Sequence, residues 1–141
     1  MALLLISMGP MVSSAQVKLG PVWRTWNARV SEDKMDDYLL YLAKVYRYKL
    51  EAWKQAGLLT DYRIVVSDPQ TPDDWNVSFM FQYKDMAALD VPEEVWDKIG
   101  KEALDNVKDQ QAKKMESLYP QWRKFVGWGK VTREVVSSTS Q

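Results

Sequence analysis

The sequence predicts a single α+β domain with its elements in the order β-α-β-β-α-β. Segments in which apolar and polar residues alternate are typical of strands, and two long segments with apolar residues at three- and four-residue steps are typical of helices. The length of 141 residues suits one domain. Each helix has one apolar stripe that must pack on a sheet, which favours a four-stranded antiparallel sheet with both helices on one face.

The first half of the chain predicts a strand followed by a long helix. Residues 21–30 are rich in β-forming side chains and alternate in polarity. Ser31 is a suitable N-cap, and Glu32 and Asp33 in the first turn favour the positive end of a helix dipole. Gly57 ends the helix. Its apolar stripe contains Met35, Leu39, Leu42, Tyr46, Leu50 and Trp53.

The second half predicts two more strands, a second helical region and a last strand. Residues 58–66 and 75–83 alternate in polarity, and the loop between them is dense in turn-forming residues. Apolar residues from Val95 to Leu118 recur at helical spacing, and Gly100 either bends this helix or splits it. Pro120 closes the helical region, and residues 125–136 form the last strand, in which Gly127 and Gly129 flank Trp128.

The order of elements, the length and the aromatic last strand resemble the dimeric α+β barrel group of ferredoxin-like proteins, over residues 20–136. The resemblance implies a homodimer. The group includes cofactor-free quinone-forming monooxygenases, small-molecule isomerases and haem-handling enzymes. Those members that ligate haem iron through His are excluded, because this chain has no His.

The composition excludes several kinds of chemistry. Without His or Cys there is no Ser-His-Asp or Cys-His nucleophile, no Cys/His zinc site and no haem ligated by His or Cys, so we expect no cofactor. General acid or base catalysis would depend on Asp61, Tyr38, Tyr83 or a desolvated Lys. The formal net charge of zero and the absence of a Lys/Arg cluster argue against a nucleic-acid partner.

The two ends of the chain differ from the rest. Residues 1–15 are apolar and uncharged and end in Ser13-Ser14-Ala15, the pattern of a signal peptide with a small-residue cleavage site, so we expect a secreted or periplasmic protein. A signal peptide normally begins with Lys or Arg, but none precedes this run. Either the true translation start lies upstream, or the run is a buried or frayed N-terminus. It is too short to span a membrane. Residues 137–141 form a polar tail.

A ligand cavity in this architecture lies between the helices and the sheet. Without the strand register, the inward-pointing side chains cannot be distinguished from the outward-pointing ones. The aromatic residues either form a stacking surface for a ligand or are simply core. Val22 is also a candidate for the apolar lining of the cavity, and Arg24 is also a candidate for its polar lining. The candidate ligand-binding residues are Trp26, Asn27, Tyr38, Trp53, Arg63, Phe79, Phe81 and Tyr83.

Acidic clusters are better explained by local structure than by chemistry. Asp68, Asp73 and Asp74 lack the spacing of a calcium loop, so a solvated turn is favoured over a cation cage and no metal site is expected. The Asp36-Asp37 and Glu93-Glu94 pairs lie near helix starts, where the helix dipole accounts for them.

The outer face of the sheet, expected to carry Asn76, Ser78, Met80 and Gln82 beside Leu59 and Val65, is too apolar for a free surface. We therefore expect a two-fold homodimer with the sheets facing each other. Three functions remain open. The favoured one is a small-molecule binding domain for an apolar or aromatic ligand, stacked on Trp26. The alternatives are a cofactor-free monooxygenase or isomerase acting on an aromatic or quinone-like compound, and a purely structural dimeric module.

Overall fold

The computed structural model describes residues 16–127 and 129–138. The expected signal peptide, residues 1–15, lies outside the described residues, as do residues 139–141 of the expected polar tail. The domain expected over 20–136 lies within the described range except for Trp128. None of the helices in the described part of the chain is long and apolar enough to cross a membrane.

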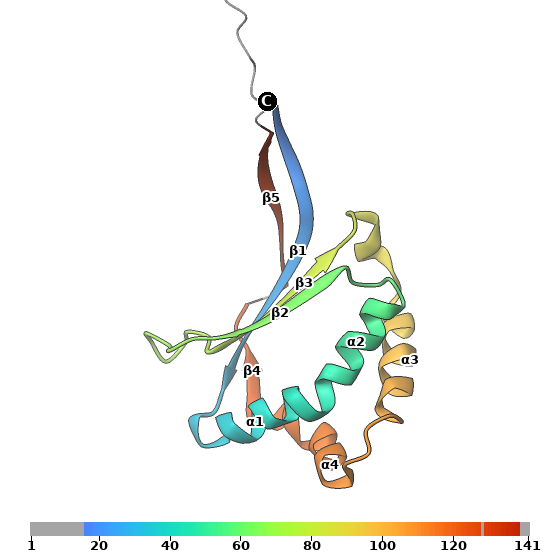
Figure 1. Cartoon of the computed structure of the whole chain (residues 1–141). Helices are drawn as coiled ribbons and strands as arrows, with labels where there is room; N and C mark the ends of the chain where they lie inside the picture. The colour runs from blue at the N-terminus through green and yellow to red at the C-terminus, as the bar shows by residue number, and fades with distance from the viewer. Residues whose placement is uncertain (1–15, 128, 139–141) are drawn as a thin grey trace, which may run out of the picture.

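Five strands form one antiparallel sheet with the helices on one face (Figure 1). The strand order is β2-β3-β1-β4, which is the order of the ferredoxin-like fold, the fold that the sequence predicts. β5 pairs with β1 along the same edge as β4, because β3 occupies the other edge of β1. The strands are β1 (Gln16–Val30), β2 (Asp61–Val66), β3 (Val77–Tyr83), β4 (Arg123–Phe125) and β5 (Lys130–Ser138).

The predicted last strand, residues 125–136, is interrupted in the structure. β4 and β5 follow β1 one after the other and together act as the fourth strand of the ferredoxin-like order. Gly127 lies between them with φ +85°, a left-handed conformation that glycine adopts readily and that breaks the extended chain. The split therefore follows from the backbone at Gly127.

The first helical region runs from Glu32 to Gln55 without a break. A 3-10 turn (Glu32–Lys34) leads into α1 (Met35–Tyr41), a π-helical turn (Leu42–Tyr46) and α2 (Arg47–Gln55). Gly57, with φ +76°, follows the end of this region as predicted. Ser31 precedes the first turn but makes no side-chain cap; its carbonyl oxygen accepts from the Lys34 amide instead.

The second helical region is split, but not at Gly100. A 3-10 turn (Ala87–Asp90) precedes α3 (Glu93–Leu104), which is followed by α4 (Gln110–Leu118) and a last 3-10 turn (Tyr119–Trp122). Asp109 caps α4 by accepting from the amides of Gln111 and Ala112. Gly100 lies inside α3, where an added Cβ would be 3.3 Å from the Trp53 ring, so it permits close packing of α3 on α2.

The core lies between the inner face of the sheet and the first helical region. Its largest fully buried side chains include Tyr38 and Tyr41. Leu39, which the predicted apolar stripe contained, is 36 % exposed, so that part of the prediction is wrong. The buried side of this region carries Tyr38, Tyr41 and Val45, which the predicted stripe left out. A second, smaller core cluster contains Val22, Leu59 and Tyr83.

The prediction for the outer face of the sheet is wrong at two residues. Leu59 is buried in the second cluster on the helix side of the sheet. Asn76 is also buried, and its side chain accepts from the Val30 amide and donates to the Val30 carbonyl oxygen, both at 2.8 Å. The other predicted residues, Ser78, Met80, Gln82 and Val65, do lie on the outer face. Trp23 and Arg63 lie there too, and Trp23 donates to the Glu134 carboxylate at 2.7 Å.

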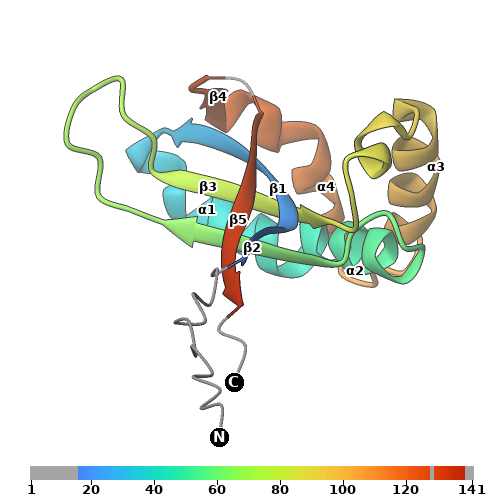
Figure 2. The same ribbon diagram turned by 90° about the horizontal axis from the view of Figure 1, so that it is seen from above.

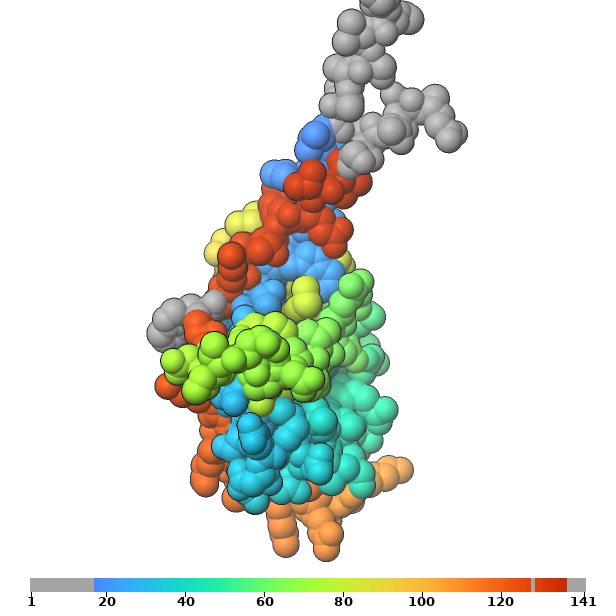
Figure 3. All heavy atoms as spheres, turned by 90° about the vertical axis from the view of Figure 1, so that its left-hand side faces the viewer, coloured from blue at the N-terminus to red at the C-terminus, as the bar shows by residue number. Residues whose placement is uncertain are grey.

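The start of β1 and the end of β5 leave the sheet as a two-stranded ribbon that projects from the body of the domain (Figures 1 and 3). A register shift between Leu19 and Val22 marks the point where the ribbon begins. Three apolar side chains on it are more than half exposed: Val17, Leu19 and Val135, at 65 %, 56 % and 72 %. Such a group of exposed apolar side chains is typical of an interaction surface.

Candidate functional site

A cleft of about 540 Å³ lies between the inner face of the sheet and helices α2 and α3. Figure 2 shows α3 standing at one end of the sheet, beside α2. Side chains from β1, β3 and β4 form one wall, and side chains from the helical regions form the other. The volume falls within the range of roughly 300–1,000 Å³ that is usual for small-molecule sites.

The sheet wall of the cleft is aromatic because of the strand register. Trp26 pairs with Phe79, and Val22 with Tyr83, so these side chains share one face of the sheet. Phe81 lies between Phe79 and Tyr83 on the same face of β3. β4 adds Phe125, whose ring centroid is 5.8 Å from that of Trp26. The wall thus offers ring faces on which a planar ligand could stack.

The helix wall is also aromatic. Tyr46 lies at the end of the π-helical turn and meets both Phe79 and Trp53 edge to face, with 5.9 Å between centroids in each case. Trp53 donates to the Trp96 carbonyl oxygen at 2.9 Å, and the two indoles are 5.5 Å apart. Single π-helical turns occur frequently at functional sites. Here the turn ends at Tyr46, a residue that lines the cleft.

Two arginines lie along the sheet wall. The Arg24 guanidinium is 4.7 Å from the centroid of the Trp26 ring, and the Arg123 guanidinium is 4.2 Å from that of Phe125. Together with the Trp26–Phe125 contact, these stacks form a continuous row, Arg24–Trp26–Phe125–Arg123, which we call the arginine–aromatic row. Within the described residues, neither guanidinium has a carboxylate within 4.0 Å, and the buried Arg24 Nε has no hydrogen-bond partner.

The remaining charged groups of the cleft differ in their surroundings. The Lys49 ammonium pairs with the Glu116 carboxylate, which also accepts from the Tyr41 hydroxyl at 2.7 Å. Glu93 and Asp97, from α3, line the other wall and are exposed to solvent. The cleft therefore has a cationic sheet wall and an acidic, well-solvated rim on α3.

Gly129 packs against the back of the row. A Cβ added there would lie 2.6 Å from Trp26 ring atoms and 2.7 Å from Arg24 Nε, much closer than atoms pack without shifting. Only a glycine allows the chain between β4 and β5 to approach these two side chains so closely. Gly129 thus fixes the position of the sheet wall from behind.

The structure brings five of the eight predicted ligand-binding residues together on the cleft: Trp26, Trp53, Phe79, Phe81 and Tyr83. That they bind a ligand stays a prediction. Asn27 and Arg63 lie on the opposite face of the sheet, since they pair with Ser78 and Met80, whose side chains point away from Phe79. They do not line the cleft.

Tyr38, the eighth predicted residue, is fully buried in the main core and does not line the cleft either. Its hydroxyl has no hydrogen-bond partner, and burial raises its pKa to about 12. Burial likewise raises the pKa of Tyr46 and of Tyr83. These phenols therefore stay protonated at neutral pH.

Asp61, another residue considered for acid–base chemistry, lies on β2 outside the cleft. Its carboxylate is 3.6 Å from the Lys54 ammonium, which is an exposed ion pair on the surface of the domain. In the turn between β2 and β3, the Asp74 carboxylate accepts from the amides of Gln70 and Trp75. Asp74 is thus used to shape the turn, as the solvated-turn interpretation expects.

Sequence reasoning missed several cleft residues. Tyr46 and Trp96 were considered only as core residues, and Arg123 and Phe125 were not considered as site residues at all. The Arg123-Lys124-Phe125 segment carries no motif, and its place beside Trp26 depends on the pairing of β4 with β1. An arginine two residues before a phenylalanine in a strand does put both on one face, which is the signal that was available.

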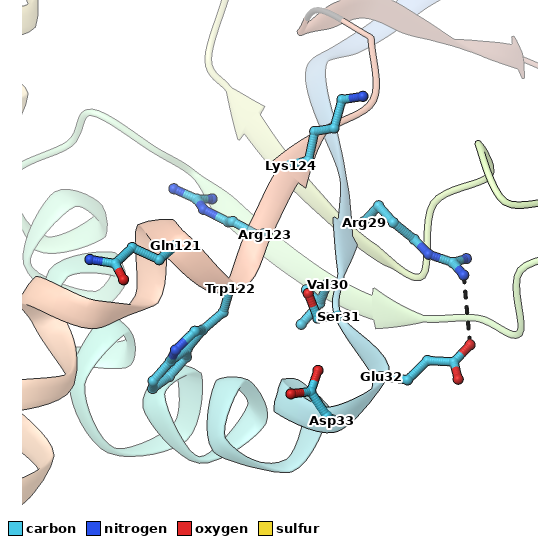
Figure 4. Close-up of a pocket in the computed structure, with 9 residues that line it drawn as sticks. All are labelled: Arg29, Val30, Ser31, Glu32, Asp33, Gln121, Trp122, Arg123 and Lys124. Atoms are coloured by element: carbon cyan, nitrogen blue, oxygen red, sulfur yellow. Dashed lines mark ion pairs between the residues drawn. The ribbon is translucent and has the colours of Figure 1, made fainter.

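A second hollow lies at the other end of β1, between Ser31–Asp33 and Gln121–Lys124 (Figure 4). Its polar groups do not converge. Arg29 is paired with Glu32 at 3.8 Å and also donates to the Asp74 carbonyl oxygen. The Arg123 side chain points away from Arg29 and Glu32 in Figure 4. We therefore place the candidate site in the aromatic cleft.

The chain is similar to solved structures of two dimeric ferredoxin-like proteins from uncultured marine organisms. The first has 13% sequence identity to this chain, and the match covers 86% of this chain and 96% of the other, with a TM-score of 0.46. The other is 14% identical, covers 82% and 95%, and has the same TM-score. No model of a protein family matches the sequence, and no curated protein does. The ferredoxin-like fold of this chain follows from its strand order.

Proposed function

We propose that this protein binds a small aromatic molecule in the cleft between the sheet and helices α2 and α3. The observation that carries the proposal is the cleft itself, which has about 540 Å³ of space with aromatic rings on both walls. A fully packed core would bury these rings against one another. Trp26 and Trp53 are instead only partly buried, so each can present ring surface to a ligand.

Binding is favoured over catalysis by the chemistry that lines the cleft. A cofactor-free oxygenase or isomerase must remove a proton from its substrate, which needs a base within hydrogen-bond reach. Burial raises the pKa of Tyr46 and of Tyr83, so these two phenols of the cleft stay protonated. The carboxylates of Glu93 and Asp97 are exposed on the rim, and the Lys49 ammonium is held by Glu116.

A titration separates the three functions considered above. Aromatic and quinone compounds, such as 2-naphthol and 1,4-naphthoquinone, would be added while tryptophan fluorescence and oxygen uptake are followed together. We expect saturable quenching without turnover. Oxygen uptake or product formation would show an enzyme, and no response to any compound would leave the structural module.

Matched variants locate the binding. Trp26→Phe replaces the indole of the sheet wall by a smaller ring and should weaken binding about two- to fivefold, since aromatic stacking contributes roughly 0.5–1.5 kcal/mol and the phenyl ring keeps part of it. Trp75→Phe changes a partly buried tryptophan that does not line the cleft and should leave binding unchanged. Equal effects of the two variants would contradict the placement of the site.

We also propose that two copies of the chain form a two-fold dimer through the outer face of the sheet and the projecting ribbon. The support is the exposure of Val17, Leu19 and Val135 on the ribbon, together with Val65 on the outer face of β2. A self-complementary surface of this kind is closed by one partner in a two-fold dimer. A stable dimer would bury at least about 1,200 Å² in total.

Light scattering of the chain at micromolar concentration tests the dimer. We expect twice the 16.4 kDa of one chain. Leu19→Asp places a charge on the ribbon and should shift the protein toward the monomer. Leu118→Asp, at an exposed position on α4, is the matched control and should remain dimeric. A monomer before any substitution would refute the dimer.

A further inference from the structure

The arginine–aromatic row holds two positive charges that lack a negative partner. Arg24 and Arg123 each stack on a ring of the sheet wall, and no carboxylate among residues 16–127 and 129–138 lies within 4.0 Å of either guanidinium. Both side chains are partly buried. An arginine stays charged at every pH at which proteins fold, so these charges persist.

Arg24 has a specific unsatisfied group. Its Nε is buried and has no hydrogen-bond partner. A buried polar atom without a partner is costly, and in native proteins such atoms are rare enough that each needs an explanation. Gly129 packs close to this atom, and the rest of the guanidinium lies over the Trp26 ring. The cation is thus held in place without being neutralised.

We infer that the ligand of this cleft is an aromatic carboxylate, whose ring stacks on the aromatic walls and whose carboxylate is bound by a guanidinium of the arginine–aromatic row, that of Arg24 or that of Arg123. The inference rests on the proposed function and adds the chemical class of the ligand. The planar guanidinium fork matches the two oxygens of a carboxylate and can bind them through two parallel hydrogen bonds. A bound carboxylate would supply a negative partner to the guanidinium that it contacts.

The other charged groups of the cleft set the orientation of the ligand. Lys49 is already paired with Glu116 and does not compete for the carboxylate. Glu93 and Asp97 are exposed on α3, where they repel an anion. The carboxylate of the ligand therefore lies toward β1 and β4, and the ring extends toward α2 and α3.

The test compares two probes of the same shape by isothermal titration calorimetry, 2-naphthoate and the neutral 2-naphthylmethanol. We expect 2-naphthoate to bind at least about tenfold more tightly, because hydrogen bonds to charged groups are about twice as strong as neutral ones. The preference should shrink with added salt, since part of it is a charge interaction at a partly solvated site.

Substitutions assign the preference to the two arginines. Arg24→Met keeps the length of the side chain and removes its charge, and Arg123→Met does the same on β4. Each should lower the preference for 2-naphthoate severalfold, with the affinity for 2-naphthylmethanol little changed. Arg47→Met is the matched control, because Arg47 lies on α2 outside the cleft, with its guanidinium 5.6 Å from the centroid of the Tyr48 ring. Thermal melting shows which variants are folded. The test of the carboxylate preference needs only one folded cleft variant.

The outcomes separate the inference from the function on which it rests. If 2-naphthylmethanol binds as tightly as 2-naphthoate, or the preference survives in both cleft variants, the inference is overturned while binding of aromatic molecules stands. If neither probe binds, both are overturned. A preference for 2-naphthoate that is lost in a folded cleft variant and kept in Arg47→Met supports the assignment.

Discussion

Substituting Gly129 by alanine should damage the cleft from behind. The added methyl group would lie 2.6 Å from Trp26 ring atoms and 2.7 Å from Arg24 Nε, where ordinary carbon contacts are about 3.5–4.0 Å. The Trp26 ring cannot simply recede, because it contacts Phe125 on the same face of the sheet. The ring and the guanidinium must therefore move by about 1 Å, into the space that the ligand would occupy.

The expected cost is that of overpacking a well-packed site, about 1–3 kcal/mol. For a domain of this size, 1 kcal/mol corresponds to roughly 3–6 °C in melting temperature. We therefore expect Gly129→Ala to lower the melting temperature by about 3–18 °C. The affinity for an aromatic ligand should fall at least about tenfold, because a shift of the stacking ring narrows the cleft.

Gly127→Ala is the matched control. Gly127 has no heavy atom within 4 Å of an added Cβ, but its φ of +85° strains any other residue. This variant should lose about 1 kcal/mol of stability through backbone strain and keep its ligand affinity. Both variants would be melted by circular dichroism and titrated by calorimetry. If Gly129→Ala keeps the melting temperature and affinity of the parent chain, the reasoning about the sheet wall is refuted.

Three further predictions concern the core and the N-terminus. Asn76→Ala should cost about 2–5 kcal/mol in urea unfolding, because it leaves the buried amide and carbonyl of Val30 without partners; a loss below about 0.5 kcal/mol would contradict this. The pKa of Tyr38 is about 12 in the folded chain, against an ordinary value of 10.0, so its contribution to stability is fully present below pH 10 and is lost as the pH rises toward 12. Tyr38→Phe, which removes a hydroxyl without a partner, should match or exceed the stability of the parent at pH 8 and lose less of it by pH 11; an equal loss would refute the assignment to Tyr38. We propose that the protein is exported and that the mature chain begins at Gln16, which mass spectrometry of protein from its native host would show; an intact Met1 or Ala2 terminus in the cytoplasm would exclude it.

Local patterns in the sequence were sufficient for the element order and the fold class. Alternation over residues 75–83 identified β3 because the face of this strand that carries Val77, Phe79 and Tyr83 is buried. Gly57 marked the end of the first helical region because a left-handed φ is needed there. The absence of His and Cys excluded whole classes of active site on composition alone.

Only the tertiary structure decided which side chains form the site. The pairing of Trp26 with Phe79 placed Arg24, Trp26 and the inward residues of β3 on one face, and moved Asn27 and Arg63 to the other. A shift of one residue in that register would have reversed every assignment, and no local pattern fixes the register. Arg123 and Phe125 joined the cleft because β4 pairs with β1 across more than ninety positions of sequence, as Ala28↔Phe125 and Val30↔Arg123 show. Contacts this distant depend on how the whole chain packs, so the segment that makes them carries no sign of them.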